Sequence, residues 1–220
     1  MSDPARCVRP ARLARLRGLY AIVGDVEPTE RARAAVAGGA AVVQLRMKRA
    51  TAGEILSVAR RVVELARGRA LVLVNDRPDL ALLAEADGVH LGDEDLPVEE
   101  ARRLLGDDLL VGRTTRTFDD VLAAARAGAD HVGFGPVFPS LTKPLDVAPR
   151  GLEGLALTCA SSPLPVVAIS GITVENVEAV ARCGAAAAAV VGDLFDHGDP
   201  RPRAEALVAA FARGAQGAAR

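Results

Sequence analysis

A regular alternation of short apolar runs with longer helical segments constrains the fold of this chain more than any other feature. The runs begin near Leu19, Ala41, Ala70, Gly88, Leu109, His131, Pro165 and Ala187. Each run is too short to form a helix alone, and several are rich in β-branched residues, so each predicts a β-strand. The runs are almost continuously apolar, which is typical of parallel strands buried on both faces.

The segments between the runs show the periodicity of amphipathic helices. Apolar residues recur at i, i+3, i+4, i+7 and i+8 in the segment 55–63, and similar spacing returns at 118–125, 174–181 and 207–211. Thr51 followed by Glu54, and Thr117 followed by Asp120, indicate capping boxes at two helix starts.

Eight strand-plus-helix units in one chain of 220 residues predict a single-domain α/β fold, the (β/α)₈ TIM barrel. An open doubly wound sheet is the alternative, but the segment Gly24–Glu27 after the first strand lacks the glycine-rich fingerprint of that fold. We expect a catalytic barrel over residues 18–213, an Arg-rich N-terminal helical extension over 1–17 and a C-terminal tail over 214–220. A transit peptide is the alternative for residues 1–17.

Composition excludes several functional classes. The formal net charge is −1 and only 3% of residues are aromatic, so a nucleic-acid partner or a membrane-surface role is not expected. No apolar stretch reaches the roughly 18–20 residues of a membrane span. The three cysteines lie far apart without a CxxC pair, which favours a reduced, cytoplasmic protein. The sequence leaves the oligomeric state open, a homo-oligomer included.

Basic side chains follow the predicted strands, where the active site of such a barrel is formed. Gln44, Arg46 and Lys48 lie on one side of a strand by the period of two, and together they would suit a diphosphate. Only Lys48 and Lys143 are lysines among 27 basic residues, and both follow strands. The use of lysine at these two positions indicates that a compact ammonium group is needed there, and chance is the alternative. For Gln44, Arg46 and Lys48 together, the alternative is a charged strand end at the surface.

Two aspartates end neighbouring predicted strands. Asp76 and Asp95 would hold Mg²⁺ together with phosphate oxygens, because hard oxygen ligands suit that cation. Each also precedes a proline at a helix start, at Pro78 and Pro97, so an N-cap role is the alternative.

Glycines in the loops after the seventh and eighth strands mark the usual phosphate site of these barrels. Gly171 and Gly192 allow close approach of a ligand to the backbone, and Ser140, Thr142 and Lys143 add donors. Ordinary turns are the alternative for these glycines. No activated nucleophile or general base is visible, and His90 fits a core histidine better than a base. Two anionic subsites with Mg²⁺ favour transfer chemistry with a diphosphate leaving group.

Five sequence motifs follow one another in a fixed order along the chain. They are Val-Gln-Leu-Arg-x-Lys (43–48), Val-Asn-Asp-Arg-x-Asp-Leu-Ala (74–81), Ala-Asp-Gly-Val-His-Leu-Gly-x-Glu-Asp (86–95), Gly-Ala-Asp-x-Val-Gly-Phe-Gly-Pro-Val-Phe-Pro (128–139) and Thr-Lys-Pro (142–144). With these motifs the chain resembles the thiamine-phosphate synthase family, and the similarity runs from Leu19 to Phe195. The family is a TIM barrel that joins hydroxymethylpyrimidine diphosphate to thiazole phosphate and releases diphosphate with Mg²⁺. The resemblance implies the same fold, substrates and cofactor here.

The resemblance also assigns roles to individual residues. It places the pyrimidine diphosphate on Gln44, Arg46, Lys48, Asn75, Thr114 and Lys143, with Arg46, Lys48, Thr114 and Lys143 as the catalytic group. It places Mg²⁺ on Asp76 and Asp95. It places the thiazole phosphate on Ser140, Thr142, Gly171, Val191 and Gly192. The implied mechanism is dissociative. Diphosphate departs first, a pyrimidine-methyl cation remains, and the thiazole nitrogen then captures this cation.

The chain departs from the family pattern mainly on the thiazole-phosphate side. Leu141 stands where Thr is common, Ser170 replaces a Gly, and Gly192 replaces a Ser; an acidic Asp193 follows. Two alternatives stay open. One is a thiazole tautomerase of the same superfamily, which has His where this chain has Pro136. The other is a non-catalytic binder of phosphorylated thiamine precursors.

Overall fold

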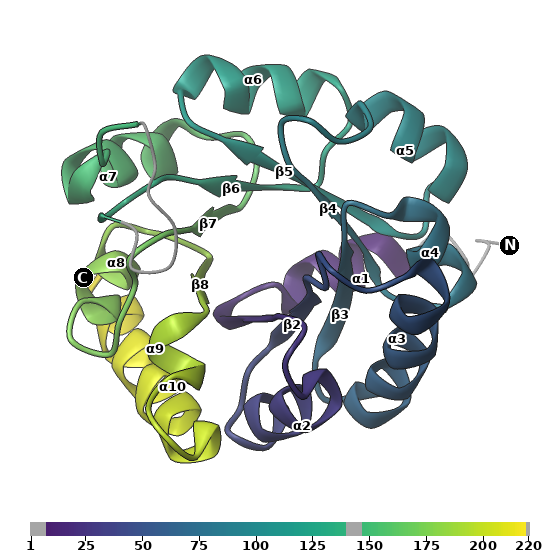
Figure 1. Ribbon diagram of the computed structural model, residues 1–220. Coiled ribbons are helices and arrows are strands. Elements are labelled where there is room, and N and C mark those ends of the chain that lie inside the picture. Colours follow the sequence, from purple (N-terminus) through teal and green to yellow (C-terminus); the bar gives the residue numbers. More distant parts are fainter. Residues whose placement is uncertain (1–7, 140–146, 219–220) are drawn as a thin grey trace, which may run out of the picture.

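In a computed structural model, which describes residues 8–139 and 147–218, eight parallel strands close into one barrel (Figure 1). Each strand pairs with the next in sequence, and the last pairs with the first through Ala21 and Val190. The prediction of a TIM barrel is therefore confirmed. The strands are β1 (Gly18–Val23), β2 (Val42–Leu45), β3 (Leu71–Asn75), β4 (Gly88–Leu91), β5 (Leu110–Thr115), β6 (His131–Phe134), β7 (Val166–Ala168) and β8 (Ala187–Val190).

All the described helices except the first follow strands in sequence and surround the barrel (Figure 1). The helices are α1 (Val8–Arg15), α2 (Pro28–Ala37), α3 (Ala52–Ala66), α4 (Pro78–Leu83), α5 (Val98–Leu105), α6 (Phe118–Arg126), α7 (Gly151–Ser161), α8 (Val177–Arg182), α9 (Gly192–Phe195) and α10 (Pro200–Ala218). Both predicted capping boxes are present, at the starts of α3 and α6. Helix α10 continues to Ala218, inside the segment 214–220 expected as a tail. No helix in the described part of the chain is long and apolar enough to cross a bilayer.

Alternate residues of each strand serve two different hydrophobic clusters. In β3, Val72 and Val74 pack outward against the helices, whereas Leu71 and Leu73 fill the inside of the barrel. Both faces of the strand are therefore buried, which explains why the sequence shows continuous apolar runs rather than alternation.

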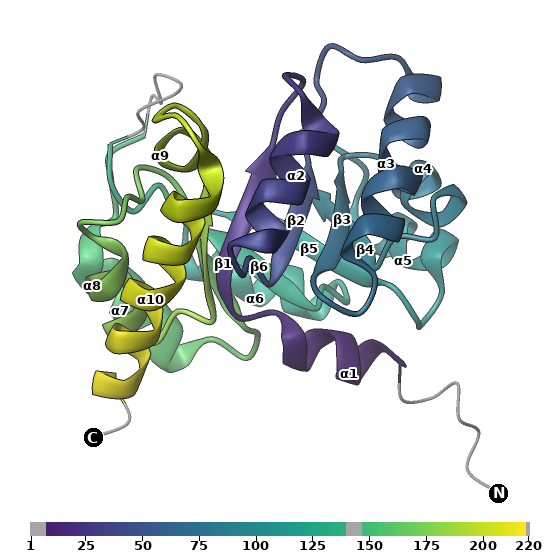
Figure 2. The same ribbon diagram turned by 90° about the horizontal axis from the view of Figure 1, so that it is seen from below.

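Helix α1 lies across the end of the barrel where the strands begin (Figure 2). The side chain of Leu16, just after the helix, is buried in the interior cluster beside Tyr20 and Leu110, and Leu13 packs against the same cluster. The amino-terminal end of the barrel is thus closed by apolar side chains. Any polar site inside the barrel must open at the other end.

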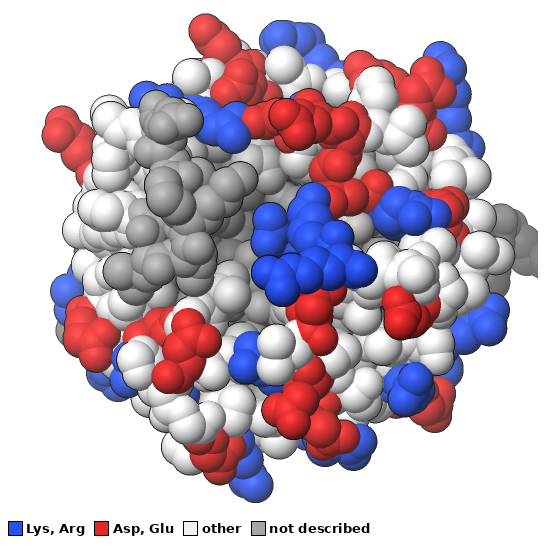
Figure 3. All heavy atoms as spheres, viewed as in Figure 1, with Lys and Arg blue, Asp and Glu red and all other residues white. Residues whose placement is uncertain are grey.

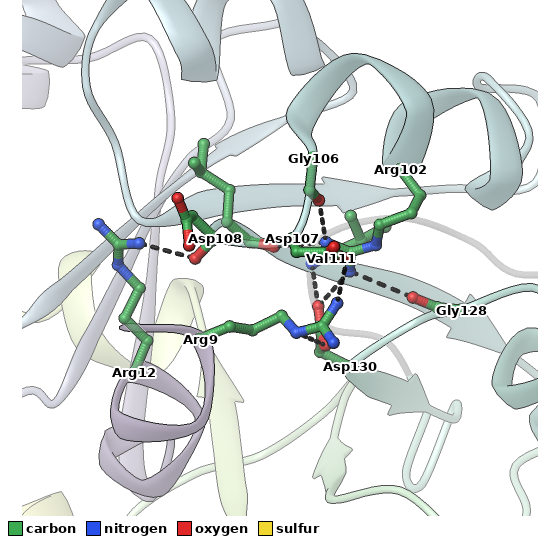
Figure 4. Close-up of polar contacts among 10 residues, drawn as sticks. Arg9, Arg12, Arg102, Gly106, Asp107, Asp108, Val111, Gly128 and Asp130 are labelled. Atoms are coloured by element: carbon green, nitrogen blue, oxygen red, sulfur yellow. Dashed lines mark hydrogen bonds and ion pairs between the residues drawn. The ribbon is translucent and has the colours of Figure 1, made fainter. Parts of the chain in front are cut away.

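Arginines of α1 bind the loops that lead into β4, β5 and β6, and Figure 4 shows the contacts with Asp108 and Asp130 before β5 and β6. Arg12 Nε donates to Asp87 Oδ1 at 2.9 Å, and Arg12 Nη1 donates to the carbonyl oxygen of Asp108 at 2.7 Å. Arg9 Nε lies 3.6 Å from Asp130 Oδ1. These contacts give two of the N-terminal arginines a structural role.

Replacing Arg12 by alanine is expected to lower the free energy of unfolding by about 1–2 kcal/mol. The reason is that the Asp87 carboxylate, which also accepts the Val72 N–H at 2.8 Å, would lose its charged partner in a half-buried setting. Urea denaturation measures the change. Arg15→Ala is the matched control because Arg15 is exposed on the same helix, and equal losses in both variants would contradict the role given to Arg12.

Candidate active site

A polar cavity of about 350 Å³ opens at the carboxyl ends of β2, β3, β4 and β5. It is lined by Arg46, Lys48, Asn75, Asp76, His90, Gly92, Asp93, Glu94, Asp95, Thr114 and Arg116. Viewed along the barrel as in Figure 1, basic side chains gather near the centre, with acidic side chains beside them (Figure 3). Side chains that lie up to 70 positions apart in sequence, Arg46 and Arg116, therefore meet at one end of the barrel. A second cavity of about 710 Å³, between α1 and α10, is lined mostly by apolar side chains and does not suit a diphosphate.

A hydrogen-bonded chain of side chains holds Gln44 in place below this cavity. Tyr20 donates its hydroxyl proton to Gln44 Oε1 at 2.9 Å, and Gln44 Nε2 donates to Asn75 Oδ1. Burial raises the pKa of Tyr20, so its hydroxyl stays a donor at neutral pH. This contact fixes which way the Gln44 amide points. No sequence pattern predicts a role for Tyr20, although it is the only tyrosine in the sequence and interrupts the first apolar run.

Asp76 and Asp95 lie at the ends of β3 and β4, and neither caps a helix. Helices α4 and α5 begin without a side-chain cap, so the N-cap interpretation of these aspartates is wrong. Asp95 Oδ2 instead accepts the N–H of Gly92 at 2.6 Å. Asp76 has a backbone φ of 64°, a conformation that aspartate tolerates better than most residues.

The two carboxyl groups interact directly with each other. Burial, together with the nearby Asp95, raises the pKa of Asp76 above its ordinary value, although Lys48 acts in the opposite direction. Burial also acts to raise the pKa of Asp95, but hydrogen bonds from Asp76 and Gly92 and the charges of Lys48 and Arg113 lower it overall. The pair therefore retains a proton more readily than two separate carboxylates would, and a cation between them would replace that proton.

The pair provides a partial ligand set for a divalent cation. Within residues 8–139 and 147–218, no group of three or more His, Cys, Asp or Glu side chains is arranged to hold a metal ion. The remaining ligands would have to be diphosphate oxygens and water. Mg²⁺ is usually bound in this way, by one or two carboxylates, water and substrate phosphates, so the residues fit Mg²⁺.

Two basic residues of the predicted site, Lys48 and Arg46, differ in what their side chains contact. The Lys48 ammonium group pairs with the Asp76 carboxylate. Arg46 is exposed at the cavity, and its guanidinium has no ion-pair partner within the described ranges. Arg46 is therefore available to bind an anion. Arg116 also lines the cavity and pairs with Asp93. It was not among the site residues predicted from the sequence.

Thr114 on β5 contacts His90 on β4. His90 Nε2 lies 2.9 Å from Thr114 Oγ1. Burial lowers the pKa of His90 to about 4, so its ring is neutral at neutral pH and is a poor general base. His90 is therefore buried, as expected of a core histidine, but its ring also lines the cavity.

The loops after β7 and β8 contain the residues predicted for the thiazole phosphate. Gly171 has a φ of 68°, and a Cβ there would lie only 2.4 Å from the carbonyl oxygen of Pro139, so glycine is required. Val191 is exposed and Gly192 begins α9. Ser140 and Thr142, also predicted for the thiazole phosphate, and Lys143, predicted for the pyrimidine diphosphate, lie outside the described residues.

Asp193 does not place a free negative charge in the loop after β8. Its carboxylate is 5% exposed, accepts from Arg203 Nε at 3.0 Å, and accepts the N–H of Val174 at 3.1 Å. The charge of Asp193 is therefore compensated by Arg203. The departure from the family pattern at this position does not by itself oppose phosphate binding.

Replacing Ser170 by glycine is expected to raise the free energy of unfolding by about 1 kcal/mol. Ser170 has a φ of 78°, a left-handed backbone conformation that is sterically strained for a residue with a Cβ but not for glycine. Urea denaturation measures the gain. Ser162→Gly is the control, because Ser162 is not in this conformation and its hydroxyl accepts the Leu164 N–H, so it should lose stability. A loss in Ser170→Gly as well would contradict the strain argument.

Similarity to known proteins extends over most of the chain. The family model described as "Thiamine monophosphate synthase" matches residues 19–194. The chain belongs to this family. The match begins in β1 and ends in α9, so it includes seven whole strands and all of β1 except Gly18, whereas α1 and α10 lie outside. The resemblance inferred from the sequence motifs is confirmed.

Individual members of the thiamine monophosphate synthase family are closely similar to this chain in sequence and in structure. The chain is 59% identical over 207 residues to thiamine-phosphate synthase of Anaeromyxobacter dehalogenans, covering 94% of this chain and 93% of that protein. It is 49% identical over 215 residues to thiamine-phosphate synthase of Myxococcus xanthus, covering 95% and 99%. The solved structure of thiamine phosphate pyrophosphorylase from Pyrococcus furiosus matches with a TM-score of 0.84 at 34% identity, covering 91% and 98%.

Proposed function

We propose that this chain is a thiamine-phosphate synthase, which joins hydroxymethylpyrimidine diphosphate to thiazole phosphate and releases diphosphate. One observation supports this function best. The Arg46 guanidinium, which has no ion-pair partner among the described residues, meets a lysine and two interacting carboxyl groups in one cavity at the carboxyl ends of β2, β3 and β4. The two cations attract a diphosphate, and a divalent cation held by the carboxyl groups would add the positive charge needed to neutralise it.

The reaction needs charge neutralisation more than proton transfer. The bond between the pyrimidine methylene carbon and the diphosphate oxygen breaks, and its electron pair leaves with the diphosphate. The lone pair of the thiazole nitrogen then forms the new carbon–nitrogen bond, so no proton has to move. This balance agrees with a cavity whose histidine has a pKa near 4 and whose other groups are mainly cations and carboxylates.

Each residue of the proposed diphosphate site has a distinct task. Arg46 provides a planar guanidinium that can make two parallel hydrogen bonds to phosphate oxygens. Lys48 and Lys143 add positive charge to the leaving group, and Thr114 adds a hydroxyl. Asn75 and Gln44 present amide groups that are oriented by Tyr20.

Asp76 and Asp95 would hold Mg²⁺. When bound, Mg²⁺ would supply positive charge to the departing diphosphate oxygens. On the opposite side of the barrel end, Gly171, Val191 and Gly192, with Ser140 and Thr142, would receive the thiazole phosphate. The compensated charge of Asp193 and the glycine-only backbone at 171 are compatible with an anion there.

An assay with both substrates distinguishes this function from its alternatives. Purified protein with hydroxymethylpyrimidine diphosphate, thiazole phosphate and Mg²⁺ is expected to form thiamine phosphate, detected as its oxidised fluorescent derivative. Binding of thiazole phosphate in calorimetry without product would favour a tautomerase or a non-catalytic binder. Conversion of a thiazole tautomer, monitored separately, would then separate these two.

A further inference from the structure

Two buried histidines lie under the proposed leaving-group site on either side of a glycine. In the strand registers, His90 of β4 is opposite Gly112 of β5, and Gly112 is opposite His131 of β6. The two imidazole rings have centroids 5.7 Å apart. All three residues therefore lie at one level inside the barrel, directly below Thr114.

The histidine rings carry buried nitrogen atoms without hydrogen-bond partners. These atoms are His90 Nδ1 and both ring nitrogens of His131, within the part of the chain that the structure describes. His131 is 0% exposed. A buried polar atom without a partner costs free energy, and an apolar ring of similar size would fill the same space without that cost. Packing alone therefore does not account for imidazoles at both positions.

The missing side chain of Gly112 brings two of these nitrogens together. A Cβ on Gly112 would lie 2.3 Å from His131 Nε2 and 2.6 Å from His90 Nδ1. The two nitrogens thus face the same small volume beside the bare backbone of Gly112. One bridging water, or a small shift of either ring, would connect two nitrogens so placed, and any side chain at 112 would displace both rings.

The orientation of the Thr114 hydroxyl depends on which nitrogen of His90 carries the proton. If His90 Nε2 carries it, Nε2 donates to Thr114 Oγ1, and the hydroxyl keeps its own proton for a diphosphate oxygen. If His90 Nδ1 carries it, Thr114 must donate to Nε2 and presents only lone pairs to an anion. A donor facing Nδ1 selects the first arrangement, and His131 Nε2–H is placed to be that donor.

We propose that His131 and His90 are positioning residues that hold the Thr114 hydroxyl as a donor toward the leaving diphosphate. In this arrangement His131 donates from Nε2 to His90 Nδ1 through one water or after a small shift of the rings, and His90 donates from Nε2 to Thr114. No proton is transferred in this arrangement. The proposal rests on the proposed function, since it takes Thr114 to contact the diphosphate.

The first test uses the unmodified protein and needs no activity. Protonated and unprotonated imidazole nitrogens have well separated ¹⁵N resonances, and the chain has only three histidines. His197→Gln removes the exposed one for assignment. We expect His90 to carry its proton on Nε2. A proton on Nδ1 of His90 would overturn the proposal even if the enzyme is fully active.

The second test compares two backgrounds by kinetics. His131→Phe keeps the ring volume and is expected to lower kcat/KM on the order of tenfold, whereas in a Thr114→Val background it should change kcat/KM less than about twofold. His131→Gln, which restores an N–H donor, should recover most of the loss. Equal factors in both backgrounds, or full activity of His131→Phe, would overturn the proposal. Unmodified protein that forms no thiamine phosphate would instead overturn the proposed function.

Discussion

Replacing Asp76 by asparagine is expected to lower kcat/KM for thiamine phosphate formation by about 100-fold or more. Asp76 is one of two carboxylates proposed to hold Mg²⁺, and a neutral amide would remove half of the negative charge that attracts the cation. Asparagine is preferred to alanine here because it tolerates the backbone φ of 64° at this position. Steady-state kinetics over a range of Mg²⁺ concentrations measure the loss, which should lessen at high Mg²⁺.

Asp93→Asn is the matched control for this prediction. Asp93 lines the same cavity, but its carboxylate pairs with Arg116 rather than with the other carboxylates. We expect its kcat/KM and its Mg²⁺ dependence to change far less than those of Asp76→Asn. An active Asp76→Asn variant with an unaltered Mg²⁺ requirement would remove Asp76 from the proposed metal site.

Replacing Arg46 by alanine is expected to lower kcat/KM on the order of 100-fold, because a bidentate contact to a charged oxygen pair is lost. Arg46 is exposed and has no ion-pair partner in the described ranges, so its removal should leave the free energy of unfolding nearly unchanged. Kinetics with the pyrimidine diphosphate as the varied substrate measure the effect on KM and kcat separately.

Arg46→Lys separates charge from geometry. Lysine keeps the positive charge but lacks the planar pair of donors, so we expect an activity between those of the unmodified protein and Arg46→Ala. Arg15→Ala, at the opposite end of the barrel, controls for the loss of one arginine. Unchanged kinetics in Arg46→Ala would show that the diphosphate binds elsewhere.

The sequence predicted the barrel well because its strands are buried on both faces. Each predicted run starts within one residue of an observed strand, for example Ala70 against Leu71 of β3 and Pro165 against Val166 of β7. Continuous apolar runs and helical periodicity are local signals, and closure into a barrel follows from their regular repetition.

For the candidate site, the sequence predicted only the polar residues that directly follow the strands. Arg46, Lys48, Asp76 and Asp95 were selected because polar residues stand out after apolar runs, and the structure brings them into one cavity. The supporting contacts could not be predicted in this way. Tyr20 and His131 belong to apolar runs, and their role depends on which strand lies beside which. The pairing of Asp193 with Arg203 depends instead on how α9 packs against α10.

The most direct test of the central claim is to quantify thiamine phosphate and inorganic diphosphate in the same reaction, with and without Mg²⁺. We predict equal amounts of the two products, both strongly reduced when Mg²⁺ is removed by a chelator and restored when it is added back. Diphosphate without thiamine phosphate would indicate hydrolysis of the pyrimidine substrate. That result, or the absence of both products, would contradict the account.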